Sequence, residues 1–140
     1  QRLCEILLKE KILLAESPEE ALEKELSSLF CPHGLGHMLG IQVHDVGGDQ
    51  KNIQGDPCDY DSKLPKARMG RALRENEVIT IEPGLYFVSF LLNEKRKSED
   101  KHLFNWDLID QLIPFGGIRI EDNLVVQKNK EPINLTRQFL

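Results

Sequence analysis

The sequence lacks the features that mark several specialised classes of protein. No apolar run approaches the roughly 20 residues that a membrane-spanning helix needs, so we expect no membrane partner. The 140 residues carry a net charge of −5, which argues against a nucleic-acid partner or an anionic membrane surface. A hydrophobic content of 40% and a charged content of 29% are typical of one folded domain rather than of a disordered segment.

Cysteine is also scarce. Cys4, Cys31 and Cys58 are odd in number and lie far apart, so they make neither a disulfide framework nor a CxxC metal-binding pattern. We therefore expect a reducing compartment, the cytoplasm. The chain starts at Gln1 rather than at methionine, and no signal peptide precedes the first apolar segment. We expect a fragment or a processed product.

The N-terminal part of the sequence predicts two helices without catalytic residues. The first runs from Arg2 to Leu13, where apolar residues recur at helical spacing among charges. The second is predicted to start at Ser17, a capping residue followed by Pro18 and a glutamate, and to end at about Phe30, before Pro32. The apolar residues with this spacing are Leu3, Ile6, Leu7, Ile12 and Leu14. In the second helix the residues expected to face inward are Ala21, Leu22, Leu26 and Leu29.

The most informative stretch is CPHGLGHMLGIQVHD, residues 31–45, which holds His33, His37 and His44 among glycines. Histidine is the commonest metal ligand and the usual proton-transfer residue near neutral pH. A helix is unfavourable, because each interior glycine costs about 1 kcal/mol relative to alanine. The stretch therefore predicts a loop that leads into a strand, in which residues four apart also share a face. Three clustered histidines favour a functional site over structural histidines.

A long polar loop is predicted after Asp45, through Lys66. A loop of that length is usually functional or mobile, although a plain surface loop is an equal alternative. Residues 77–82 then predict a strand, because they are rich in β-branched residues. Alternation places Thr80 and Glu82 on one face. A carboxylate at the end of a buried strand is costly unless it is paired or bound to a metal, so Glu82 is a candidate site residue.

The C-terminal part predicts two further elements. An apolar run, residues 85–92, and a charged loop, residues 93–102, precede a short helix from Asn105 to Leu112 with Asn105 as its cap. A strand from Ile118 to Val126 follows. Its alternation predicts an apolar face and a polar face, as in a strand that lines a polar cavity, although a solvated edge strand remains the alternative. The apolar face holds Ile118, Ile120, Leu124 and Val126, and the polar face holds Arg119, Glu121 and Asn123.

The segments PHGLGHMLGIQVHD, TIEPGLYF and GGIRIEDN together strongly resemble the pita-bread metallopeptidases, most closely the Xaa-Pro dipeptidases (prolidases). HLFNWDLIDQL and NLTR are similar to the same group, so the resemblance covers nearly the whole chain, in order. It implies an α+β fold of the pita-bread (creatinase/aminopeptidase-like) type, a mainly antiparallel curved sheet with covering helices. Residues 1–140 would form a single partial domain, the C-terminal part of the catalytic domain.

The resemblance also implies a role for each matched residue. His37, Glu82 and Glu121 match metal ligands, and Glu121 would bridge two ions. Glu82 is in addition the usual candidate for the general acid and base. His44 would contact the substrate and stabilise the tetrahedral intermediate, and His33 matches a further active-site histidine.

Two arginines complete the implied site. Arg119 would orient the bridging glutamate beside it. Arg68, fourteen residues before Glu82, matches the arginine that holds the free carboxylate of a dipeptide. A planar guanidinium suits that carboxylate because it can pair bidentately. A free carboxylate next to the scissile bond exists only in a dipeptide, so Arg68 favours a dipeptidase.

The implied complete enzyme uses two divalent metal ions, manganese by family habit, to hydrolyse dipeptides with a C-terminal proline, and it is expected to be a homodimer. Two of the family's five ligands are aspartates that precede everything in this sequence. The chain would therefore carry three ligands, bind at most one ion weakly, and be inactive alone. The alternatives are an aminopeptidase P-like peptidase and a non-catalytic remnant or interaction module.

Overall fold

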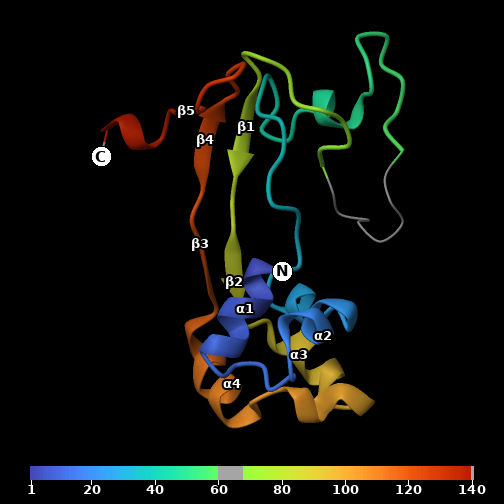
Figure 1. Cartoon of the computed structure of the whole chain (residues 1–140), viewed down its shortest axis with the longest axis vertical. Coiled ribbons are helices and arrows are strands. Elements are labelled where there is room, and N and C mark those ends of the chain that lie inside the picture. The colour runs from blue at the N-terminus through green and yellow to red at the C-terminus, as the bar shows by residue number, and fades with distance from the viewer. Residues whose placement is uncertain (60–67, 140) are drawn as a thin grey trace. The chain divides into compact units, whose positions relative to one another are not determined.

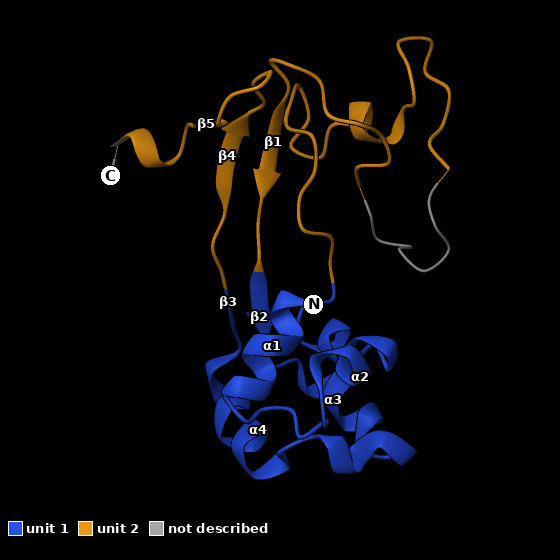
Figure 2. Ribbon diagram, in the orientation of Figure 1, with its two compact units in different colours: residues 1–32, 84–118 blue, residues 33–83, 119–140 orange. Residues whose placement is uncertain are grey.

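The computed structural model describes residues 1–59 and 68–139 (Figure 1). It divides into two compact units, one of residues 1–32 and 84–118 and the other of residues 33–83 and 119–140 (Figure 2). The part of the predicted long loop that spans residues 60–66 lies outside the described residues. Among the residues that are described, no helix is long and apolar enough to cross a membrane.

The first unit is mainly helical. Its short sheet pairs β2 (Gly84–Tyr86) with β3 (Gly117–Arg119), whose last residue belongs to the second unit. Short 3-10 helices at residues 26–29, 99–103 and 113–115 follow α2, α3 and α4. The α-helices are α1 (Arg2–Lys9), α2 (Pro18–Glu23), α3 (Ser89–Lys95) and α4 (Trp106–Leu112).

Two predicted helix caps are confirmed. The Ser17 side chain accepts a hydrogen bond from the backbone N–H of Glu20 at the start of α2. The Asn105 side chain accepts one from the backbone N–H of Leu108 at the start of α4. Each cap satisfies a backbone donor that the first helical turn leaves without an intrahelical partner.

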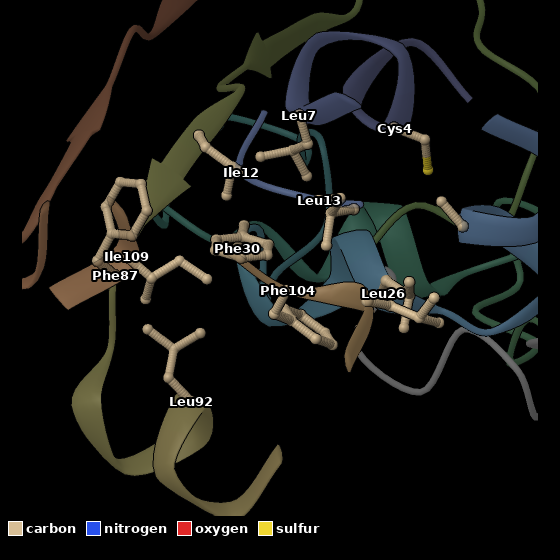
Figure 3. Close-up of a cluster of buried hydrophobic side chains, with 12 residues drawn as sticks. Cys4, Leu7, Ile12, Leu13, Leu26, Phe30, Phe87, Leu92, Phe104 and Ile109 are labelled. Carbon is tan, nitrogen blue, oxygen red and sulfur yellow. The ribbon is translucent and has the colours of Figure 1, made fainter. Parts of the chain in front are cut away.

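The first unit holds a continuous apolar core (Figure 3). Phe30 contacts two other aromatic rings, Phe87 at 5.7 Å and Phe104 at 6.3 Å between ring centroids. Leu92 of α3 and Ile109 of α4 are fully buried in the same cluster. The helices thus pack around aromatic side chains from separate parts of the sequence.

The first two helices are shorter than predicted. α1 ends at Lys9, and the backbone turns at Lys11, where φ is 56°. Leu13 then forms a β-bridge with Phe104, so a pairing distant in sequence replaces the last helical turn. Leu14 lies beyond this helix and is exposed, and Ile6 is exposed although it lies within α1, so neither belongs to the apolar core.

The second predicted helix breaks at Glu25, where φ is 52°, and continues only as a 3-10 turn from Leu26 to Leu29. Ala21 and Leu26 are buried as predicted, but Leu22 is exposed. The left-handed conformation of Glu25 changes the direction of the chain between α2 and the 3-10 turn. The apolar residues of the two parts therefore do not lie on one helical face.

Residues 85–102 are largely helical, which contradicts the loop predicted for residues 93–102. The apolar run of residues 85–92 is divided between the end of β2, at Tyr86, and α3, which begins at Ser89 and buries Leu92 in the apolar core. The predicted charged loop is largely helical, with Glu99–Leu103 as a 3-10 helix. Its charges pair locally, as Lys95 does with Asp100.

The second unit is built around an antiparallel sheet of β1 (Val78–Ile81), β4 (Asp122–Val125) and β5 (Ile133–Asn134), in the order β1-β4-β5. In its register Thr80 lies opposite Asn123. Along the other edge of β1 runs the histidine segment, seen beside β1 in Figure 1, with Met38 paired antiparallel to Ile79. The predicted loop is confirmed, but the strand expected after it is reduced to two isolated bridges, at His37 and Met38.

The strand predicted from Ile118 to Val126 is interrupted. β3 ends at Arg119 and β4 begins at Asp122, while the Ile120 N–H donates to the carbonyl of Pro83. Ile118 and Ile120 are exposed, so the predicted apolar face is wrong in its first half. Antiparallel strands together with helices make the chain α+β, as predicted.

Candidate functional site

His37 is a buried residue on the extended segment beside β1, with 4% of its surface exposed. Its carbonyl accepts the Thr80 N–H, and the Leu39 N–H donates to the carbonyl of Val78. A Cβ atom on Gly36 would lie 2.0 Å from the Thr80 carbonyl oxygen. The glycine before His37 therefore permits the close approach that brings the imidazole onto β1.

His37 faces Glu82, the residue that follows β1. The Nε2 atom of His37 lies 3.2 Å from Oε1 of Glu82, and Glu82 is only 7% exposed. The other ring nitrogen, Nδ1, lies 2.9 Å from the carbonyl oxygen of Met38. A carbonyl can only accept, so Nδ1 donates that hydrogen bond. A neutral His37 would then direct its Nε2 lone pair at a carboxylate oxygen, which also carries lone pairs. Two such acceptors are stable side by side only when a proton or a metal ion binds both of them.

Thr80 joins the two members of this pair. Its hydroxyl accepts a hydrogen bond from the His37 backbone N–H at 3.1 Å and donates one to Oε1 of Glu82 at 3.3 Å. The alternation of β1 placed Thr80 on the face of Glu82, but the sequence did not assign the hydroxyl a function.

Arg119 binds the second oxygen of the same carboxylate. Its Nη1 atom lies 3.1 Å from Oε2 of Glu82. The two oxygens of Glu82 thus have different partners, His37 and Thr80 on one and Arg119 on the other. The role of Arg119 toward Glu121 stays a prediction, and the structure adds this ion pair with Glu82.

His44 lies beside His37 although seven residues separate them in the sequence. The two rings meet edge to face, with 4.4 Å between their centroids. The Asp45 N–H donates to the Met38 carbonyl, the same carbonyl that binds His37, and the Asp45 side chain accepts the Gly47 N–H. These bonds fold the chain back so that the exposed His44 contacts the buried histidine.

An ion pair that sequence reasoning missed ties this turn to β1. The Arg71 guanidinium forks onto both oxygens of Glu77, at 2.7 and 3.1 Å, and its Nε–H donates to the carbonyl of Gly47. Burial raises the pKa of Glu77, but the Arg71 hydrogen bonds, the Arg74 backbone N–H and both positive charges outweigh burial, so this pKa lies below its usual value. An arginine and a glutamate that are six residues apart form no recognisable motif, so this clamp could not be predicted from the sequence.

The structure also describes three other predicted site residues, Arg68, His33 and Glu121. The backbone of Arg68 forms a parallel bridge with His37. His33 is half-buried, and its Nδ1 lies 2.7 Å from the carbonyl oxygen of Gly34. Glu121 is exposed between β3 and β4. Within residues 1–59 and 68–139, no group of three or more His, Cys, Asp or Glu side chains could hold a metal ion. The structure brings His37, Glu82, His44 and Arg119 together, and the ligand role of Glu121 stays a prediction.

Comparison with known proteins gives consistent matches along the chain. The model of metallopeptidase family M24 matches residues 9–128. An Xaa-Pro dipeptidase of Enterobacter sp. (strain 638) is 47% identical over 137 residues, which cover 98% of this chain and 31% of the relative. An Xaa-Pro dipeptidase of Yersinia enterocolitica is 44% identical over 139 residues, again 31% of its length. The chain therefore spans about a third of the length of these curated relatives.

Solved structures agree with this match. Zinc-substituted aminopeptidase P of Escherichia coli, in complex with product, has a TM-score of 0.58 and 26% identity, and the match covers 99% of this chain and 24% of that one. Proline aminopeptidase P II of Yersinia pestis has a TM-score of 0.57 and 25% identity, with the same coverage.

Proposed function

Because the chain belongs to metallopeptidase family M24, we propose that it is part of a metal-dependent Xaa-Pro dipeptidase. The complete enzyme would hydrolyse dipeptides that end in proline. Residues 1–140 would be a single partial domain, the C-terminal part of a pita-bread catalytic domain. The names of relatives at 44–47% identity support the dipeptidase assignment.

The observation that carries the proposal is the buried contact between His37 and Glu82. Nε2 and Oε1 face each other at 3.2 Å, while Nδ1 is occupied by the Met38 carbonyl. An imidazole nitrogen and a carboxylate oxygen together form a donor set that suits manganese or zinc. The hydrogen bond on Nδ1 fixes the tautomer that such a ligand needs. The residues present therefore fit one side of a metal site.

We propose that His37, Glu82 and Glu121 would hold metal in the complete enzyme, with manganese as the ion. A bound divalent ion would lower the pKa of a coordinated water molecule and would polarise the scissile carbonyl. Two further ligands of the family pattern have no counterpart in this sequence. The chain alone would therefore bind at most one ion, weakly, and have no activity.

The chain's own residues would supply the remaining chemistry. Glu82 would accept a proton from the attacking water and deliver it to the proline nitrogen as the peptide bond breaks. Arg119, held on Oε2, would keep the carboxylate oriented. His44 would donate a hydrogen bond to the developing oxyanion, and its ring is already set against His37. His33 would be a further active-site histidine, and Arg68 would bind the free carboxylate of the dipeptide.

An aminopeptidase P-like peptidase is the second candidate. The structural neighbours named aminopeptidase P favour it, at 25–26% identity, and the ligand types are common to both activities. The higher identity to proteins named Xaa-Pro dipeptidase favours the first candidate, as does Arg68. A non-catalytic remnant or interaction module is the third candidate. We further propose a cytoplasmic location and a homodimeric complete enzyme, with no nucleic-acid or membrane partner.

The deciding experiment compares two chains in a Gly-Pro hydrolysis assay with manganese. One is the present chain, and the other is the same chain joined to the preceding part of the Enterobacter dipeptidase. We expect turnover only by the extended chain, and loss of that turnover with Glu82→Gln. Hydrolysis of longer Xaa-Pro peptides in preference to Gly-Pro would favour the aminopeptidase. An extended, folded chain without any turnover would favour the non-catalytic remnant.

A further inference from the structure

We propose that Thr80 is a positioning residue, whose single hydroxyl group fixes His37 and Glu82 relative to each other. This inference rests on the proposed metal-dependent function, because it concerns two of the expected ligands. Thr80 is 1% exposed and lies two residues before Glu82 on β1. It would act through its two neighbours and would not touch the substrate.

The direction of both hydrogen bonds follows from the chemistry of the partners. A backbone N–H can only donate, so the Thr80 oxygen accepts from His37 at 3.1 Å. An ionised carboxylate can only accept, so the Thr80 hydroxyl proton points to Oε1 of Glu82 at 3.3 Å. The hydroxyl group therefore has one defined orientation, and it connects the backbone of one expected ligand with the side chain of the other.

The pairing between residues 37 and 80 shows why a hydroxyl is useful at this position. In a hydrogen-bonded antiparallel pair, two residues exchange two backbone bonds. Here the Thr80 N–H donates to the His37 carbonyl at 2.9 Å, but the return bond from the His37 N–H goes to the side-chain oxygen. A valine at position 80 would keep the β-branched shape and the first bond, and it would lose the second.

The hydroxyl also acts on the oxygen that faces the imidazole. Oε1 of Glu82 contacts both Thr80 and Nε2 of His37, whereas Oε2 is bound by Arg119. A donor on each oxygen restricts rotation of the carboxylate about its last bond. Without the Thr80 hydroxyl, Oε1 would keep its contact with His37 but would lose this hydrogen-bond donor. Loss of such an orienting partner typically lowers metal affinity by about 10–100-fold.

Three variants distinguish the contribution of the Thr80 hydroxyl from that of its methyl group. Thr80→Val keeps the shape and removes the hydroxyl, Thr80→Ser keeps the hydroxyl and removes the methyl, and Thr80→Ala removes both in case valine disturbs folding. Two quantities are measured on the 140-residue chain. One is the hydrogen-exchange rate of the His37 amide without metal, by NMR, and the other is the dissociation constant of manganese, by electron paramagnetic resonance.

With Thr80→Val we expect the His37 amide to exchange about fivefold faster or more, because a hydrogen bond contributes about 1 kcal/mol and about 1.4 kcal/mol corresponds to a factor of ten. We expect manganese affinity to fall by about 10–100-fold. Thr80→Ser should restore both quantities to within about threefold, since it keeps the orienting hydroxyl. A serine variant as impaired as the valine variant, or a folded valine or alanine variant with unchanged exchange and affinity, would overturn the proposal. If the unsubstituted 140-residue chain binds too little manganese to measure, the affinities are compared in the extended chain described above. If the extended chain also binds none, the metal-dependent function fails, and the amide exchange still decides whether Thr80 positions His37.

Discussion

Oε1 of Glu82 lies 3.2 Å from Nε2 of His37, and both side chains are buried. This contact joins a residue that follows β1 to a residue on the segment that runs along the edge of β1. Burial of an imidazole nitrogen against a carboxylate oxygen destabilises the folded chain unless a proton or a cation binds both atoms. The pair is therefore the part of the candidate site whose chemistry can be tested most directly.

The first prediction concerns Glu82. Glu82→Gln replaces a charged oxygen ligand with a neutral amide of nearly the same shape. The manganese affinity of the chain should therefore fall by at least about tenfold, because loss of a residue that supports a metal site already lowers affinity by about 10–100-fold. An electron paramagnetic resonance titration measures it. Glu94→Gln is the matched control, because Glu94 pairs with Lys97 on the surface. Equal affinities in all three proteins would contradict the assignment of Glu82 as a ligand.

The second prediction concerns the clamp between Arg71 and Glu77. Glu77→Gln should lower the free energy of unfolding by about 1–3 kcal/mol at neutral pH, because it removes hydrogen bonds to a charged group. The pKa of Glu77 lies below its ordinary value of 4.5 in the folded chain. The contribution is therefore complete above pH 4.5 and is lost as the pH falls through the lower folded value.

Urea unfolding at neutral pH and again well below pH 4.5 measures this effect. The difference between the unsubstituted chain and Glu77→Gln should be largest at neutral pH and should shrink on acidification. Glu94→Gln again serves as the control, since an exposed pair contributes at most about 1 kcal/mol. A difference that grows as the pH falls would show that the carboxylate is not the stabilising form.

The success of sequence reasoning differs between the two units. Alternation in β1 correctly placed Thr80 and Glu82 on one face, and the glycines around His37 correctly indicated an extended segment rather than a helix. Both are local properties of strands. The end of α1 was missed, because it depends on a bridge between Leu13 and Phe104, which are far apart in the sequence.

The candidate site shows the same limit. The resemblance assigned roles to His37, Glu82 and Arg119, but it did not predict that Arg119 would bind Glu82. Nor did it predict that Arg71 would tie the turn after His44 to the start of β1. Such contacts depend on side-chain directions and on backbone carbonyls exposed by a turn. Neither leaves a periodic signal in the sequence.

The third prediction concerns substrate choice and uses the extended chain described above. Arg68→Ala should raise KM for Gly-Pro far more than it alters activity on longer Xaa-Pro peptides, because only a dipeptide offers a carboxylate next to the scissile bond. Steady-state kinetics on both substrates measure it. Arg74→Ala is the control, since Arg74 bonds the exposed carbonyl of Lys51. Equal losses on both substrates would favour the aminopeptidase and leave Arg68 a structural role.

The last prediction is that the 140-residue chain is catalytically inactive and binds manganese weakly. A hard divalent ion prefers about six oxygen or nitrogen ligands. The proposed set in this chain is His37, Glu82 and Glu121, and only the first two are in contact. A second ion would have Glu121 alone, so a nucleophilic water would not be held between two ions as the two-metal mechanism requires.

Exposed apolar residues predict a third property of the isolated chain, self-association. Ile41, Val43 and Ile53 of the second unit are largely exposed, and apolar groups of this kind favour self-association. Calorimetric titration of manganese into the chain, a Gly-Pro assay, and sedimentation at several protein concentrations measure the three properties. We expect weak binding of one ion at most, no turnover, and association that increases with concentration. Tight binding of two ions, or turnover near that of an ordinary peptidase, would contradict the prediction, because it would require ligands beyond His37, Glu82 and Glu121.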